Sequence, residues 1–205
     1  LPGAGWDTKT RLTLSGKTEG EATNLKSDLG SIKIAGGNAT VTWGDATGEL
    51  KKLHRESPTL GLRAPTGATV LFDGSNVDAW NPGKLAEPGL MGVGTRTKEK
   101  FGSFTLHLEF RSPFMPYANG QARGNSGMYL HDQYECQILD SFGLEGKDNE
   151  CGGIYINSKP LVNMCFPPLS WQTYDVEMTA AKFDDAGKVT APAKVTIKHN
   201  GVVIH

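Results

Sequence analysis

Strict alternation of apolar and polar residues in three short segments is the feature that most constrains this fold. In residues 104–111 every even position is apolar and every odd position is polar, and residues 134–138 and 174–178 keep the same apolar phase. Successive side chains of a strand point to opposite faces, so each segment predicts a strand with an apolar and a polar face. No segment sustains the 3,4-spaced apolar pattern of a long amphipathic helix. The chain is therefore predicted to be all-β, with two packed antiparallel sheets or one sheet whose polar face is open.

Aromatic residues divide the chain into two parts. Four Trp, five Tyr and eight Phe make 17 aromatic residues, and only Trp6 and Trp43 precede residue 70. We expect a small β-meander over residues 1–56, a linker over 57–69 and the main sandwich over 70–205. A surface segment held against the sandwich would have the same Pro- and Gly-rich composition as the linker. The meander strands are expected at residues 11–15, 21–25, 31–35, 38–43 and 49–54.

The charge of the chain argues against a charged partner. Its formal net charge is −1 and it has no long run of like charge, which gives no footprint for nucleic acid or an anionic membrane. The longest uncharged stretch, residues 160–174, contains three prolines and is shorter than the ~20 residues of a membrane helix. We therefore expect a neutral partner and no transmembrane segment.

The ends and the cysteines bear on cellular context. The chain starts at Leu1 without Met or a signal peptide, and it stops four residues after the Asn200-Gly201 hairpin signal, so we expect a fragment. Cys136, Cys151 and Cys165 fit no CxxC metal pattern. A Cys151–Cys165 bridge would suit an oxidising compartment, and three buried free thiols are the alternative.

Six sequence blocks follow one another in an order that carries a resemblance. They are Leu71 to Trp80, Phe101 to Arg111, Arg123 to Leu130, Tyr134 to Ser141, Cys151 to Tyr155 and Trp171 to Asp175. As a set they resemble the 3-keto-disaccharide hydrolase family, also described as 3-keto-glucoside 1,2-lyase and 3-keto-2-hydroxy-glucal hydratase. The resemblance runs from about residue 69 to the end and implies a concanavalin A-like jelly-roll sandwich.

Two departures from the family pattern stand out. The closing Gln-Asp-His block and the Arg-Asn strand of the family are absent from the chain. Residues 1–56 lie outside the family pattern and resemble an N-terminal extension of some planctomycete members, so we expect a role in stability, partner contact or anchoring. We expect a bacterial protein of the periplasm or the extracellular space.

The resemblance implies a 3-keto-glucoside or 3-keto-disaccharide as substrate. A ketone at C3 acidifies the hydrogen on C2, so a base can form an enolate that expels the aglycone from C1. Such a site needs a base and an enolate stabiliser. We expect Glu135 as the base and Arg111 as the stabiliser, with Asp140 as a further catalytic residue. A divalent metal could take the stabilising role; no other cofactor is evident.

Further polar residues are candidates for binding the sugar hydroxyls. We expect the open face of the sandwich to display Glu109, Arg111, Glu135 and Gln137 together. The expected substrate-binding residues are Glu109, Gln137, Asn125, Arg123, His131 and Tyr129.

Each candidate also has an ordinary structural interpretation. Glu135 could be a solvated strand residue, and Arg111 could join a cross-strand ion pair. Asp140 could bond local backbone amides, and Tyr129 could serve packing alone. His131 together with His107 is a weak signal for a metal.

Two other classes of function compete with the leading one. Glu135, Gln137 and Asp140 have the i, i+2, i+5 spacing of the acidic strand motif in laminarinase-type sandwiches, which would make the protein a conventional glycoside hydrolase. A non-catalytic, lectin-like carbohydrate-binding module is the third class, because the fold alone permits it.

Overall fold

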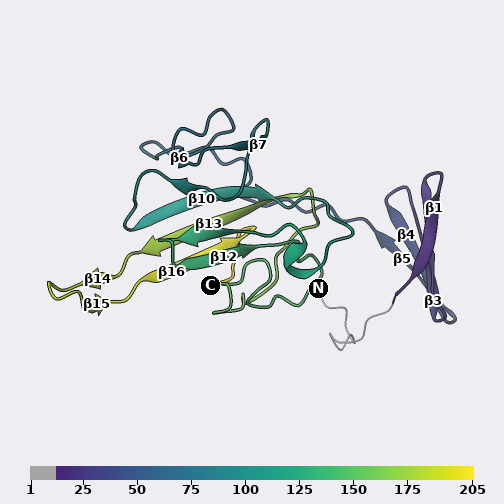
Figure 1. The fold of residues 1–205 in the computed structure, drawn as a ribbon. Coiled ribbons are helices and arrows are strands. Elements are labelled where there is room, and N and C mark those ends of the chain that lie inside the picture. The colour runs from purple at the N-terminus through teal and green to yellow at the C-terminus, as the bar shows by residue number, and fades with distance from the viewer. Residues whose placement is uncertain (1–12) are drawn as a thin grey trace. The chain divides into compact units, whose positions relative to one another are not determined.

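A computed structural model describes residues 13–205 and divides the chain into two compact units at Arg55/Glu56. Figure 1 shows that strands make up nearly all of its regular structure. No helix within residues 13–205 has the length and apolar character needed to cross a bilayer.

The first unit is a five-stranded antiparallel meander in which each strand pairs with the next. Two-residue turns that begin with a glycine of positive φ (Gly20, Gly36 and Gly44) join three of its four strand pairs. Such turns match the twist of paired strands. The third and fourth predicted strands are close to those observed, whereas the last lies three residues away. The first predicted strand, 11–15, begins outside the described residues and overlaps the observed strand only at Ser15. The strands are β1 (Ser15–Glu19), β2 (Ala22–Lys26), β3 (Gly30–Ala35), β4 (Asn38–Trp43) and β5 (Ala46–Lys51).

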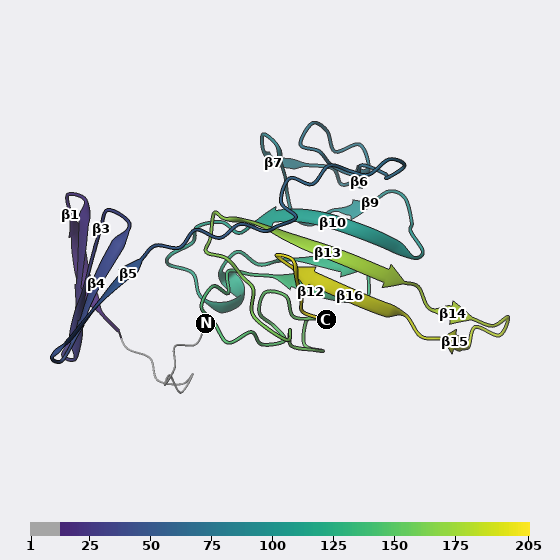
Figure 2. The same ribbon diagram turned by 180° about the vertical axis from the view of Figure 1, so that it is seen from behind.

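The second unit contains the sandwich. One layer is a four-stranded antiparallel sheet in the order β10-β13-β16-β17, whose first three strands lie side by side in Figures 1 and 2. Its strands are β10 (Phe104–Arg111), β13 (Trp171–Thr179), β16 (Lys194–His199) and β17 (Val202–Val203). The expected Asn200-Gly201 hairpin is confirmed, because both residues have positive φ and join β16 to β17.

The other layer is built on the hairpin of β11 (Ser126–Leu130) and β12 (Tyr134–Ile138). The far edge of β12 is paired with the segment around Ile154, where Tyr155 N–H donates to Glu135 O at 2.9 Å. Short elements complete the unit: β6 (Trp80–Asn81), β7 (Leu85–Glu87), β8 (Leu90–Met91), β9 (Arg96–Thr97), η1 (Gly120–Ala122), β14 (Lys182–Phe183) and β15 (Val189–Ala191).

The core lies between the two layers and confirms the predicted β-sandwich. Apolar residues of β10, β13 and β16 pack against those of the hairpin in one cluster. Tyr174 crosses it, because its buried hydroxyl donates to Gln137 O at 2.7 Å. Burial lowers the pKa of His199 to about 3, so this ring is neutral in the core. The three segments of strict alternation are all strands, and their apolar positions contribute to this core except Tyr134, which is 44% exposed.

The three cysteines are free and buried in this core. The structure therefore has the three free thiols of the second interpretation and no Cys151–Cys165 bridge. Burial is the main cause that raises the pKa of the Cys136 thiol far above its usual range, so this side chain behaves as a small apolar residue.

The expectation that Glu109, Arg111, Glu135 and Gln137 share one open face is wrong. Glu109 and Arg111 alternate with core residues of β10 and point outward from the four-stranded layer. Glu135 alternates with the buried Cys136 and points outward from the opposite layer. A sandwich has two outward faces, one on each layer. Alternation shows which side chains of a strand face the core, but it does not show which layer contains the strand.

The expected linker over residues 57–69 begins as part of the second unit. Ser57 is 5% exposed, and its hydroxyl lies 2.6 Å from that of Thr173 on β13. Gly61 N–H donates to Glu109 on β10. Residues 57–61, here called the strap, therefore lie across the outer face of the four-stranded layer.

Candidate active site

Glu135 lies at a shallow pocket on the outer face of the β11–β12 hairpin. The pocket has a volume of about 250 Å³. It is lined by Tyr129, Gln133, Tyr134, Glu135, Ile154, Tyr155, Ile156 and Asn157. Aromatic rings and amide groups beside a carboxylate suit a small polar ligand such as a sugar.

Strand register brings Tyr129 to Glu135. The two residues are directly paired, and the Tyr129 hydroxyl donates to Glu135 Oε2 at 2.9 Å. This hydrogen bond is the main cause of a raised pKa of Tyr129, so the phenol keeps its proton and remains a donor. Tyr129 therefore orients the carboxylate at the pocket, and the second oxygen, Oε1, has no hydrogen bond from residues 13–205.

Gly127 provides the space in which Glu135 lies. A Cβ atom built on Gly127 would overlap the carboxylate and would lie 2.6 Å from Glu135 Cδ, well inside van der Waals contact. The φ angle of Gly127 is not positive, so the position does not need glycine for its backbone conformation. The glycine is required here because the Glu135 side chain lies flat over the strand.

Gln137 and Asn125, expected to bind sugar hydroxyls, lie in an amide cluster centred on Gln121. The Gln137 side chain is buried, with 1% of the residue exposed, and its Nε2 donates to Gln121 Oε1 at 3.0 Å. Asn125 Nδ2 donates to the same oxygen at 3.4 Å. Gln137 is thus an internal support of the hairpin, and Asn125 stays exposed beside it.

Arg123 and Asp140 form an ion pair with Nε and Oδ2 2.8 Å apart. The Asp140 side chain is 3% exposed, and Asp140 N–H donates to Arg123 O at 3.1 Å. This pair, buried on the Asp140 side and partly exposed on the Arg123 side, joins the loop before β11 to the segment after β12. A retaining glycosidase needs two carboxyl groups that both reach the substrate, and Asp140 is not accessible in this arrangement.

His131 is a turn residue between β11 and β12. His131 and Asp132 both have positive φ. The His131 Nε2 atom lies 2.8 Å from Gly102 O, and the ring meets Phe104 edge to face. These contacts place the His131 side chain at the hairpin turn, and it does not line the pocket.

Glu109 and Arg111 have partners on the outer face of the four-stranded layer. Arg111 pairs with Glu87 at 3.6 Å and lies over the Trp171 ring, 5.5 Å from its centroid. The charge of Arg111 therefore does not meet that of Glu135, and the combination expected from sequence is not formed. No group of three His, Cys, Asp or Glu side chains within residues 13–205 is arranged to hold a metal ion.

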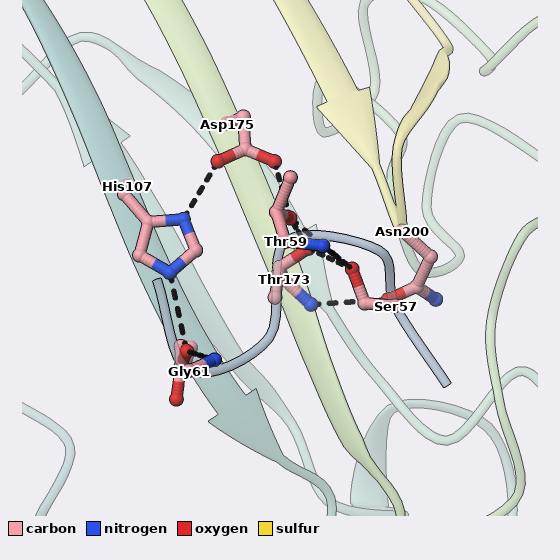
Figure 3. A network of polar contacts seen from close by, with 8 residues as sticks. Ser57, Thr59, Gly61, His107, Thr173, Asp175 and Asn200 are labelled. Atoms are coloured by element: carbon pink, nitrogen blue, oxygen red, sulfur yellow. Dashed lines mark hydrogen bonds and ion pairs between the residues drawn. The ribbon is translucent and has the colours of Figure 1, made fainter. Parts of the chain in front are cut away.

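A polar network under the strap was not expected from the sequence. His107 lies between two carboxylates, with Nδ1 2.6 Å from Asp175 and Nε2 3.2 Å from Glu109. Figure 3 shows the His107 ring beside Asp175. The Thr59 hydroxyl donates to the other oxygen of Asp175 at 2.7 Å. Because both ring nitrogens face carboxylates, only the protonated imidazole donates to both.

The protonation of His107 should make attachment of the strap dependent on pH. Burial lowers the pKa of His107, but hydrogen bonds and charges from Asp175 and Glu109 outweigh it, so the net shift is upward. The resulting stabilisation is complete below the unfolded pKa of ~6.5 and is lost as pH rises through the folded pKa. We expect the difference in unfolding midpoint between wild type and His107→Gln to shrink from about pH 5.5 to about pH 8.5. Denaturant titrations at both pH values measure it, and a constant difference would contradict the prediction.

Tyr155, Asn157 and Gln133 line the pocket with Glu135 and were not expected from the sequence. Tyr155 was visible as the end of the block Cys151 to Tyr155, but its position depends on pairing between Ile154 and Cys136. Local sequence carries no signal for that long-range contact.

The fold and the site define a class: a two-layer β-sandwich with a carboxylate at a small pocket on the outer face of one layer. Residues 67–205 match the family model described as 3-keto-alpha-glucoside-1,2-lyase-like domain. The chain belongs to this family.

One solved structure is similar to a large part of this chain. It is described as a "putative glycosyl hydrolase" from Parabacteroides distasonis and is 34% identical, with a TM-score of 0.62. The similarity covers 69% of this chain and 65% of that chain, so the present chain spans less than two thirds of that protein. The comparison with curated proteins gives no match.

Proposed function

We propose that this domain cleaves 3-keto-glucosides, with Glu135 as the base that removes the proton from C2. The observation that carries the proposal is the pairing of Glu135 with Tyr129 at a pocket, in a chain of a 3-keto-glucoside lyase-like family. The solved relative described as a glycosyl hydrolase supports a carbohydrate substrate.

The proposed reaction is an elimination. Glu135 takes the C2 proton, and the electron pair of the C–H bond forms an enolate with the C3 ketone. The enolate then collapses to restore the ketone, a double bond forms between C1 and C2, and the bond from C1 to the aglycone oxygen breaks. The protonated Glu135 can return its proton to that oxygen, which regenerates the base. Addition of water to the product would make the net reaction a hydrolysis.

Tyr129 positions the base in this proposal. Its hydroxyl fixes one oxygen of the carboxylate, and the other is left to meet the substrate. Arg111 has no part in the proposed step, because it lies on the other outward face. The burial of the Asp140 carboxyl and its pairing with Arg123 disfavour the conventional two-carboxylate hydrolase. Periplasmic or extracellular location stays a prediction.

A direct test compares a 3-keto-glucoside with its unoxidised parent, each incubated with full-length protein in the presence and absence of a chelator. We expect release of aglycone from the 3-keto compound alone, because only the ketone acidifies the C2 hydrogen. Equal cleavage of the parent would favour a conventional hydrolase. Binding of either sugar without cleavage would favour a lectin-like module.

A further inference from the structure

The five-stranded sheet of the first unit has one face without charged side chains. Residues paired across an antiparallel ladder share a face, so the register assigns every strand residue to one side. The large side chains on this side, the apolar face, are Leu25, Ile32, Ile34, Val41, Trp43 and Leu50. The charged residues of the five strands all lie on the other side: Lys17, Glu19, Lys26, Lys33, Glu49 and Lys51.

Nothing within the described part of the first unit covers this face. Ile34, Trp43 and Leu50 are 41%, 49% and 59% exposed, and no residue between 13 and 55 is fully buried. A sheet with one apolar side is stable when that side packs against another layer. The first unit is a single layer, so its apolar face has no second layer to pack against within the described part of that unit.

We propose that the apolar face packs against the same face of a second copy of this chain. Two such sheets would form a sandwich related by a two-fold axis, in which each copy supplies the layer that the other lacks. The face suits a copy of itself because its charges are confined to the opposite side, so pairing buries no charge and brings no like charges together.

The size of the face predicts a weak dimer. With a strand spacing of ~4.8 Å and a rise of ~3.3 Å per residue, the apolar face of one copy has an area of about 400 Å². Pairing of two copies would therefore bury about 800 Å² in total. Stable dimers bury roughly 1,200–2,000 Å². The dimer should therefore form only when the protein concentration is in the micromolar range or above.

Gly48 allows a sharp test. It lies on the apolar face opposite Val41 in the edge strand β5, its φ is not positive, and a Cβ atom built there meets nothing within 4 Å. Gly48→Lys should therefore fold and place a charge within the interface. Thr47→Lys is the matched control, because the neighbouring residue on the same strand is exposed on the charged side.

Sedimentation velocity of the full chain over a wide range of concentration measures the association. We expect a monomer–dimer equilibrium. Gly48→Lys should raise the dissociation constant of the dimer at least tenfold, whereas Thr47→Lys should change it by no more than about twofold. Leu50→Glu, at an exposed position of the same face, is a second variant, and circular dichroism checks folding of each. A wild-type chain that is monomeric throughout, or equal weakening by both lysine variants, would overturn the proposal.

Discussion

Replacing Glu135 by Gln should lower the turnover of a 3-keto-glucoside by ~10²–10⁴-fold, the usual contribution of a general base. The amide keeps the volume of the side chain and can still accept a hydrogen bond from Tyr129, but it cannot take the C2 proton. Substrate binding should therefore be nearly retained. Steady-state kinetics on the variant should show the loss in kcat with little change in KM.

Glu177→Gln is the matched control for this prediction. Glu177 is an exposed glutamate on the outward face of β13, in the other layer of the sandwich. The control should retain wild-type turnover. Solvent deuterium should also appear at C2 of recovered 3-keto substrate with the wild type, if proton removal is reversible, and should be absent with Glu135→Gln. A Glu135→Gln variant with unchanged turnover would refute Glu135 as the base.

The strands could be predicted from sequence because alternation and turn chemistry act locally. Residues 104–111 form β10 with the predicted boundaries, and their apolar positions face the core. Asn200-Gly201 likewise forms the hairpin expected from its turn preference. Both features depend on neighbours a few residues away, so one sequence is sufficient to identify them.

The arrangement of the site could be predicted only in part, because it depends on which layer holds each strand. Glu135 was correctly expected to point away from the core, and the resemblance drew attention to it. The prediction that Glu135 and Arg111 lie on the same face was wrong, because β10 and β12 belong to opposite layers. The alternation of a strand is the same in either layer, so it carries no information on this choice.

The strap shows a second limit of the same kind. Ser57, Thr59 and Gly61 have the composition of a linker, and their role depends on partners more than 40 residues away in sequence. The hydroxyl of Thr59 meets Asp175 only after β13 is placed. Composition therefore could not distinguish a free connection from a segment bonded to the sheet.

Gly127→Ala should lower turnover by about 10²-fold although it removes no functional group, because misplacing a reacting group by about 1 Å can have that effect. The new methyl group would occupy the space of the Glu135 carboxylate, so the side chain must rotate away from its position beside Tyr129. Stability should change little, since the obstructed atoms belong to a flexible side chain and alanine suits a strand at least as well as glycine. Kinetics and thermal unfolding of the same variant separate the two effects.

Gly48→Ala controls for the general effect of replacing a strand glycine by alanine. Gly48 also lies in a strand and has no positive φ, and a Cβ atom built there would meet nothing within 4 Å. It should leave turnover unchanged. The double variant Gly127→Ala with Glu135→Gln tests whether the methyl group acts through Glu135. If it does, the double variant should be no less active than Glu135→Gln alone, since residues that act as a unit are not additive. Multiplied losses in the double variant would instead mean that Gly127 serves the pocket independently of Glu135.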